Sequence, residues 1–239
     1  MAGTGTRTLE INMEHFFDTR EQASVAAAER LVKNLSKRLE HQPAASLVVS
    51  GGSTPARCFA ELAGSDIDWS RVHVLLSDER WVPPVDDDSN EKLVRETLLR
   101  KHASKAKLWP AYADDVDVED RCEALDEIIR TLPIPFASSL LGMGEDGHFA
   151  SLFPDADNLD QGLDSDSRQL CIPVRTAASP HPRISLTLAA VSRSDEVVLL
   201  IFGDAKRQVY ERAKGTGNSF PIAQLIKQKR APVHVYWAP

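Results

Sequence analysis

The stretch from Leu141 to Pro154 places one histidine and two acidic residues among three glycines, directly after an apolar segment. Histidine exchanges a proton near neutral pH, so His148 could deprotonate a water molecule that attacks a carbonyl carbon. Asp146 could orient the imidazole and support it electrostatically. The alternative is a turn whose histidine caps a helix or binds a backbone carbonyl. A nucleophilic serine is disfavoured, because no G-x-S-x-G motif is present and Ser151 is expected in a helical turn.

A second glycine turn, Ser50 to Pro55, lies between an apolar segment and a helical pattern. Gly51 and Gly52 would let the backbone approach a ligand closely. The free N–H groups at the helix start, together with the hydroxyls of Ser53 and Thr54, would bind an anion such as phosphate. The alternative is that one of these hydroxyls simply caps the helix. The motif is neither a P-loop nor a dinucleotide fingerprint, so ATP and NAD gain no support.

The charged residues Asp78, Glu79 and Arg80 follow a strongly apolar segment. Ligands of α/β proteins bind beyond the carboxyl ends of the strands, so this position fits a binding site. Arg80 could offer a planar fork to phosphate or carboxylate oxygens, and Asp78 could orient substrate hydroxyls or an arginine. The alternative, a solvated loop with internal ion pairs, is expected for the run 86–88. Ser89 is expected to cap a helix.

Short apolar segments alternate with amphipathic helical patterns along the chain. Strands are expected at 47–49, 72–76, 136–141, 168–174, 184–188, 196–202 and 232–237, and helices at 18–41, 56–62, 89–101, 119–131, 204–213 and 221–228. This alternation predicts an α/β fold in three layers, with a mostly parallel sheet flanked by helices. We expect one domain over residues 1–239, with a mobile surface loop at 155–167.

The composition is that of an ordinary globular protein, with 42% hydrophobic and 26% charged residues. The net charge of −7 disfavours nucleic acid and anionic membranes as partners, and it requires local cations wherever an anion binds. The three cysteines are widely spaced, so neither a disulfide framework nor a zinc site is expected. Without a signal peptide or a membrane-spanning apolar run, a cytoplasmic location is expected.

In order and spacing, these motifs resemble the 6-phosphogluconolactonase family, within the broader group that includes glucosamine-6-phosphate deaminases. The resemblance is carried by SGGSTP at 50–55, SDERWVP at 77–83, DSN at 88–90, LGMGEDGHFASLFP at 141–154, PRISLTL at 182–188 and GDAK at 203–206. It implies a modified Rossmann-like sheet of the NagB/RpiA type. It also implies hydrolysis of 6-phospho-D-glucono-1,5-lactone to 6-phosphogluconate, in the oxidative pentose phosphate pathway, without cofactor or metal.

The resemblance also implies a role for each site residue. His148 would be the general base with Asp146 beside it. As a separate hypothesis, Arg80 or a backbone N–H of the glycine loops would stabilise the oxyanion. The residues expected to bind the substrate and its phosphate are Gly51, Gly52, Ser53, Thr54, Asp78, Arg80, Gly144, Arg183 and Lys206. Arg183 could instead form a surface ion pair, and Lys206 could simply be solvated.

Phe153 separates this reaction from that of the deaminases. Deaminases typically read I-A-F-N-E-P after the D-G-H core, whereas this chain reads F-A-S-L-F-P and has Phe153 at the position of the glutamate. A phenyl ring cannot transfer a proton, so lactone hydrolysis is favoured. The alternatives are a deaminase or isomerase of amino sugar phosphates and a non-catalytic sugar-phosphate sensor. We expect a small-molecule substrate and a monomer or weak homodimer.

Overall fold

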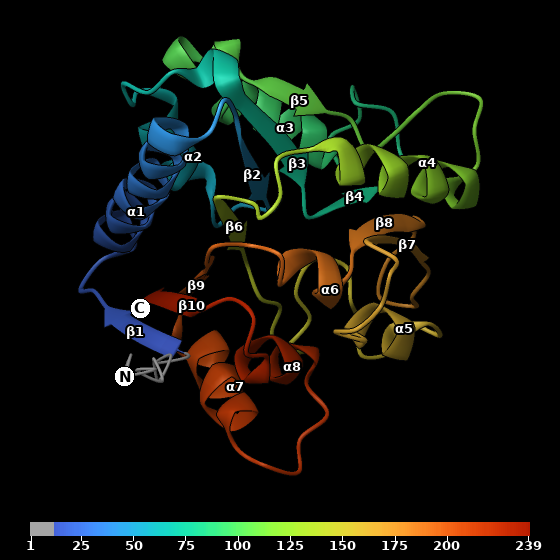
Figure 1. Ribbon diagram of the computed structural model, residues 1–239. Coiled ribbons are helices and arrows are strands. Elements are labelled where there is room, and N and C mark those ends of the chain that lie inside the picture. Colours follow the sequence, from blue (N-terminus) through green and yellow to red (C-terminus); the bar gives the residue numbers. More distant parts are fainter. Residues whose placement is uncertain (1–11) are drawn as a thin grey trace, which may run out of the picture.

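The computed structural model describes residues 12–239 and contains a seven-stranded sheet (Figure 1). Its strands are β1 (Asn12–Phe16), β2 (Ala45–Val49), β3 (Val72–Leu76), β5 (Lys107–Trp109), β6 (Ser138–Leu141), β9 (Val197–Phe202) and β10 (Val233–Ala238). The order is β1-β10-β9-β6-β2-β3-β5, and every neighbouring pair is parallel. Every residue of β2, β6 and β10 is buried, as expected for strands covered on both faces. The predicted α/β class is confirmed.

The helices follow the amphipathic patterns of the sequence. They are α1 (Arg20–His41), α2 (Ala56–Ala63), α3 (Asn90–Thr97), α4 (Val118–Thr131), α5 (Leu159–Leu163), α6 (Leu188–Val191), α7 (Asp204–Lys214) and α8 (Pro221–Lys227), with 3-10 turns at Trp69–Arg71 and Lys101–Lys105. Ser89 caps α3 as predicted, because its hydroxyl accepts a hydrogen bond from the Lys92 amide at 3.2 Å. The segment 155–167, expected to be a mobile loop, contains α5, whose Gly162 is buried.

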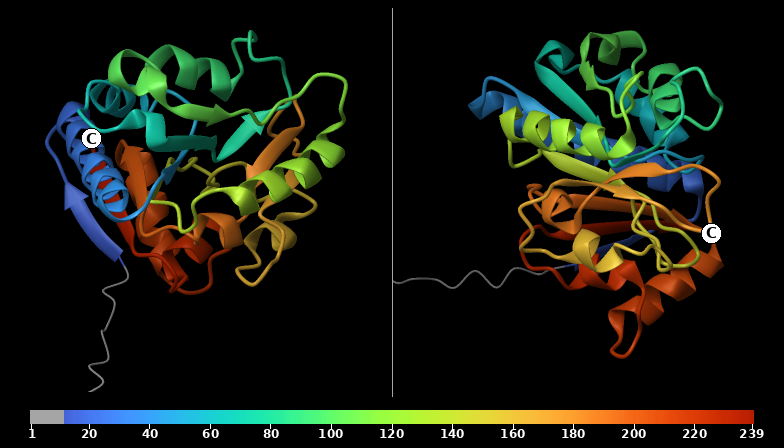
Figure 2. Two further views of the ribbon diagram at one scale, coloured as in Figure 1. Left: turned by 45° about the horizontal axis from the view of Figure 1, so that its top comes forward. Right: turned by 90° about the vertical axis from the view of Figure 1, so that its right-hand side faces the viewer.

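The order of the strands reverses between β2 and β6. From β2 the chain proceeds to β3 and β5 on one side, then returns to β6 and continues to β9 and β10 on the other. The two halves of the chain accordingly lie side by side in all views (Figures 1 and 2). At such a switch point the loops after adjacent strands diverge and leave a crevice. Here those loops are the two glycine motifs, residues 50–55 and 142–147.

A small antiparallel sheet stands apart from the main one. Its strands are β4 (Asp78–Arg80), β8 (Arg183–Leu186) and β7 (Cys171–Val174), in the order β4-β8-β7. The chain changes sheets at Ser77, whose amide donates to Val49 at 2.8 Å and whose carbonyl accepts from Leu186 at 2.8 Å. The strand expected at 184–188 ends at Leu186, because Thr187 caps α6. Residues 78–80 therefore form a strand paired with β8, and their side chains point alternately to its two sides.

An ionic cluster attaches α1 to the amino ends of β9 and β10, opposite the switch-point loops. The Arg30 guanidinium binds both carboxylate oxygens of Glu196, at 2.8 and 2.7 Å, and approaches Nε2 of His234 at 2.7 Å. Burial is the main cause that lowers the pKa of His234 to about 4. His234 is therefore a neutral core residue near neutral pH.

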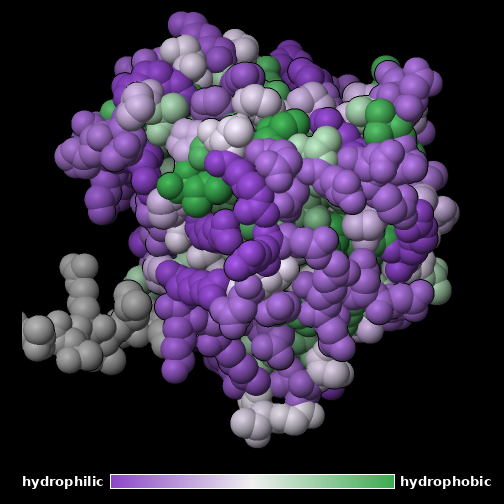
Figure 3. All heavy atoms as spheres, turned by 45° about the vertical axis from the view of Figure 1, so that its right-hand side comes forward, coloured by the Kyte–Doolittle hydropathy of each residue, from purple (hydrophilic) through white to green (hydrophobic). Residues whose placement is uncertain are grey.

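The described surface is largely polar. In the view of Figure 3, hydrophilic side chains cover most of the molecule and apolar ones form small, separate patches. Among residues 12–239, no helix combines the length and the apolar character that crossing a membrane requires. The expectation of no signal peptide concerns a stretch of which residues 1–11 lie outside the described part of the chain.

Candidate active site

A cavity of about 270 Å³ lies at the switch point, between the loops that follow β2 and β6. It is lined by Ser50, Gly51, Gly52, Ser53, Thr54, Asp78, Arg80, Asn90, Gly142, Met143, Gly144, His148, Ala150, Arg183 and Lys206. These include all nine residues expected from the sequence to bind substrate, together with His148. Asp146 does not line the cavity, but it is hydrogen-bonded to His148, which does. Segments far apart in the sequence thus meet in one place.

His148 and Asp146 form a hydrogen-bonded pair. Nδ1 of His148 lies 2.6 Å from Oδ1 of Asp146, and the same oxygen accepts the His148 amide at 3.1 Å. Burial alone would raise the pKa of Asp146, but the hydrogen bond and the charge of His148 outweigh it and lower that pKa. An ionised Asp146 accepts the Nδ1 proton, which leaves Nε2 as the basic nitrogen.

The lack of a side chain at Gly144 provides the space that the His148–Asp146 pair occupies. A β-carbon on Gly144 would lie 2.3 Å from the His148 ring and 2.5 Å from the Asp146 carboxylate. Its amide is already used, since it donates to the His148 carbonyl at 2.9 Å. Gly147 adopts φ +79° with Phe220 packed against it, so this turn also favours glycine. The glycines of the motif therefore set the position of the imidazole.

The phenyl ring of Phe153 packs against the imidazole of His148. The two ring centroids are 4.2 Å apart, and the Arg183 guanidinium lies over the phenyl ring, 5.1 Å from its centroid. Phe153 is buried. The position where an acid would stand in the deaminase pattern thus holds an apolar ring that contacts both His148 and Arg183.

The loop at 50–55 presents the start of α2 to the cavity. Of the side chains in the described range 12–239, none caps this helix, so the alternative that Ser53 or Thr54 serves as its cap is wrong. Gly52 has φ +83°, and a β-carbon on Gly51 would lie 1.8 Å from Oδ1 of Asn90. The loop leaves backbone amides and two hydroxyls for an anion.

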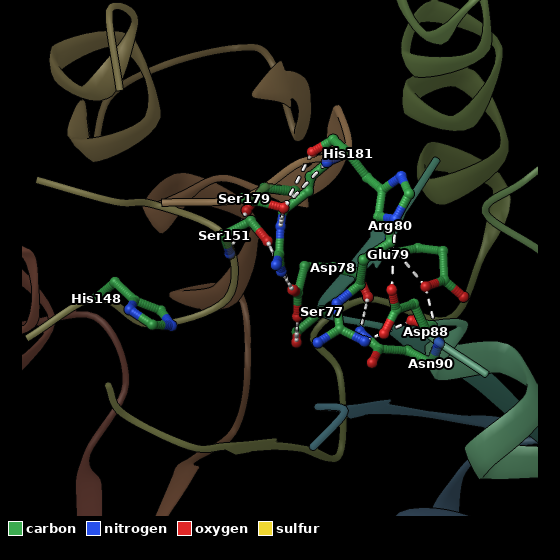
Figure 4. A network of polar contacts seen from close by, with 12 residues as sticks. Ser77, Asp78, Glu79, Arg80, Asp88, Asn90, His148, Ser151, Ser179 and His181 are labelled. Atoms are coloured by element: carbon green, nitrogen blue, oxygen red, sulfur yellow. Dashed lines mark hydrogen bonds and ion pairs between the residues drawn. The ribbon is translucent and has the colours of Figure 1, made fainter. Parts of the chain in front are cut away.

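Successive side chains of β4 point to opposite sides of the strand, so its three charged groups lie in two different environments. Asp78 and Arg80 line the cavity. Glu79 lies on the opposite side and accepts the amides of Asn90 and Glu91, at 2.8 and 2.7 Å, as Figure 4 partly shows. Burial raises the pKa of Glu79, and the hydrogen bonds from α3 oppose that rise. This helix cap was not expected from the sequence, because three successive charged residues show no polarity pattern that would place Glu79 apart from its neighbours.

Three cations face the cavity without full neutralisation. Arg80 and Arg183 are paired across β4 and β8. Burial lowers the pKa of Arg183; Asp78, 3.7 Å from it, opposes this effect and the charge of Arg80 adds to it. Lys206 has a pKa lowered mainly by burial and makes no salt bridge with any residue from 12 to 239. Neither a surface ion pair of Arg183 nor simple solvation of Lys206 describes this arrangement, which favours an anionic ligand.

The sequence analysis missed two polar residues of the site. Asn90 lines the cavity, and its amide group donates to the Asp78 carbonyl at 2.8 Å. Ser151, expected in a helical turn, lies in a non-helical turn and is fully buried. Within the described part of the chain, no group of three or more His, Cys, Asp and Glu side chains is arranged to hold a metal ion.

Comparisons with known proteins identify the family of this chain. A family model described as glucosamine-6-phosphate isomerases/6-phosphogluconolactonase matches residues 18–237. A 6-phosphogluconolactonase from Mesorhizobium japonicum is 40% identical over 93% of this chain and 94% of its own length. One from Caulobacter vibrioides is 40% identical over 93% of this chain and 95% of its own.

A solved structure shows the same fold. The crystal structure of a 6-phosphogluconolactonase from Shewanella baltica has a TM-score of 0.92 at 35% identity, covering 96% of this chain and 99% of that one. The family resemblance and the predicted fold type are both confirmed. The chain belongs to the glucosamine-6-phosphate isomerase/6-phosphogluconolactonase family.

Proposed function

We propose that this protein hydrolyses 6-phospho-D-glucono-1,5-lactone to 6-phosphogluconate, the second step of the oxidative pentose phosphate pathway. The observation that carries the proposal is the His148–Asp146 pair, in which Nδ1 of a histidine that lines the cavity is engaged and Nε2 is left as the basic nitrogen. The same cavity holds the cations that a phosphorylated lactone requires. The family and its 6-phosphogluconolactonase members support this assignment.

The reaction begins with substrate positioning. The phosphate is bound by the amides at the start of α2, the hydroxyls of Ser53 and Thr54, and Lys206. Arg80 and Arg183 add further positive charge to the lining of the cavity. Nε2 of His148 removes a proton from water as its oxygen attacks the lactone carbonyl carbon. The tetrahedral intermediate then collapses, the bond from that carbon to the ring oxygen breaks, and the imidazolium returns the proton to the ring oxygen.

Arg80 is our candidate for the oxyanion donor. The alternative expected from the sequence is a backbone N–H of the glycine loops, and among these the Gly144 amide is already hydrogen-bonded to the His148 carbonyl. Arg80 donates one N–H to the Asp88 carbonyl, and its side chain lines the cavity. A donor of this type contributes about 3 kcal/mol to the transition state.

Phe153 favours a lactonase over an amino-sugar deaminase. The ring occupies the place beside His148 where a second acid could transfer a proton, and it is buried. The decisive test follows freshly made phosphogluconolactone at mildly acidic pH, with and without the purified protein. We expect faster ring opening with the protein. No acceleration, or ammonia release from glucosamine 6-phosphate, would contradict the proposal.

We further propose that the whole chain acts as one catalytic domain in the cytoplasm, on a free small molecule and without a cofactor. Its net charge of −7 disfavours a nucleic-acid or membrane partner. A monomer or weak homodimer fits this proposal, and sedimentation at several protein concentrations would test it. Turnover by the purified chain alone would dismiss a non-catalytic sugar-phosphate sensor.

A further inference from the structure

Ser151 links two charged residues of the site while being fully buried itself. Its hydroxyl lies 2.7 Å from Oδ2 of Asp78 and 3.3 Å from Nη1 of Arg183, and its amide donates to the hydroxyl of Ser185 at 3.1 Å. Figure 4 shows Ser151 beside Asp78 of the small sheet, with His148 apart from this network. Ser151 has no contact with the cavity of its own.

The direction of both hydrogen bonds follows from the groups involved. A guanidinium only donates, so the Ser151 oxygen must accept from Arg183 and give its single proton to Asp78. The other oxygen of Asp78 accepts from the hydroxyl of Ser77 at 2.8 Å. Arg183 and Asp78 are 3.7 Å apart, beyond a good hydrogen bond, so the serine hydroxyl completes the connection between them.

Arg183 is held on its other side as well. Its Nε donates to the hydroxyl of Ser179 at 3.1 Å, and its guanidinium lies over the ring of Phe153. Two serine hydroxyls and one ring thus fix the plane of a side chain that otherwise has many rotamers. Ala150, immediately before Ser151, adopts φ +49°, a conformation that costs on the order of 1 kcal/mol. That backbone turn separates His148, at the cavity, from Ser151 in the interior.

We infer that Ser151 is a positioning residue, whose hydroxyl orients Arg183 toward the anionic group of the substrate. The inference rests on the proposed function only for the identity of that substrate. Ser151 acts through Arg183 and never touches the ligand. Its loss should therefore weaken the binding of phosphorylated ligands, and only while Arg183 is present.

A double-mutant cycle tests this coupling without relying on turnover. The affinity for 6-phosphogluconate is measured by calorimetry for the wild type, Ser151→Ala, Arg183→Ala and the double variant. We expect Ser151→Ala to weaken binding about tenfold, the effect of losing one hydrogen bond to a charged group. The double variant should bind within about twofold of Arg183→Ala, since one contact has then been removed twice. Additive losses would overturn the inference.

Ser192→Ala is the matched control. Its hydroxyl is also buried, but it has no hydrogen-bond partner within residues 12–239, so its removal should leave affinity and turnover within about twofold of the wild type. If Ser151→Ala fails to fold, Ser151→Cys keeps the volume and weakens the donor, and it takes the same place in the cycle. A loss of affinity in Ser192→Ala equal to that in Ser151→Ala would show a packing effect instead.

Turnover separates this inference from the proposed function. In the lactonase assay Ser151→Ala should raise KM for the phosphorylated lactone about tenfold and change kcat less than about threefold. Coupled binding losses in a protein that does not open the lactone would refute the proposed function and leave the positioning role intact. Lactonase activity with additive losses would refute the positioning role alone. Absence of phosphate-dependent binding in the wild type would refute both.

Discussion

The imidazole of His148 packs against the phenyl ring of Phe153, with 4.2 Å between the ring centroids. One face of the imidazole is thereby covered, and its Nδ1 edge is held by Asp146. No hydrogen bond from Nε2 to residues 12–239 accompanies these contacts, and the ring lines the cavity. A general base has to be held in one orientation, so these contacts support the proposed role of His148.

Replacing His148 by alanine should remove the base and leave the binding groups in place. We expect kcat to fall about 10²- to 10⁴-fold, the usual contribution of a general base, while the affinity for 6-phosphogluconate changes little. Steady-state kinetics and calorimetry on the same preparation would measure both. Wild-type turnover in this variant would show that His148 is not the base.

Gly144→Ala should disturb the base without changing its chemistry. The new methyl group would lie 2.3 Å from the His148 ring, so the imidazole must move away from Asp146. We expect kcat to fall at least about tenfold, because misplaced catalytic groups lose rate steeply. Gly64→Ala is the control, since its β-carbon would meet nothing closer than 3.7 Å. Equal activity of the two variants would mean that the pair tolerates displacement.

Lys206→Ala should weaken binding of the phosphorylated lactone relative to an unphosphorylated lactone. The half-buried Lys206 side chain lines the cavity, so its replacement removes positive charge from the proposed phosphate site. We expect kcat/KM for the phosphorylated substrate to fall about tenfold or more, and that for the other to change little. Lys229→Ala, an exposed surface change, controls for net charge. Equal losses on both substrates would argue against phosphate contact.

The buried His234 should make the fold less stable in mild acid. Its pKa is about 4 in the folded chain against an ordinary 6.5, so the unfolded chain binds the extra proton first. Stability should therefore fall as pH drops from about 6.5 to 4 and level off below, by roughly 3 kcal/mol at most from this residue. Denaturation of the wild type and of His234→Gln across that range would measure the difference. The same pH slope in both proteins would assign the effect to other groups.

Much of the site was predictable because its residues lie in loops with unusual composition. Glycines beside titratable or hydroxyl side chains marked residues 50–55 and 142–147, and the parallel-sheet pattern placed both loops at the same edge. Nine expected binding residues do line one cavity. Their roles remain predictions.

What the sequence did not reveal depends on partners distant in the chain. β1 (Asn12–Phe16) shows no regular alternation, because Glu14 and His15 are both polar, and it becomes a strand by pairing with β10 at the sheet edge. The three residues of β5 are too few to show a pattern. The role of Ser151 arises only where β4 and β8 bring Asp78 and Arg183 together. No local signal encodes such a meeting of segments.

The alternation of β4 also constrains how this protein can change. Arg80 lines the cavity, and the neighbouring Glu79 accepts the amides at the start of α3. Inserting or deleting one residue between Ser77 and Trp81 would rotate the carboxylate into the cavity and the guanidinium out of it. The anion site would turn repulsive and the neighbouring helix would lose its cap in the same event. Substitutions are therefore the tolerable route of divergence in this segment, and changes of length are not.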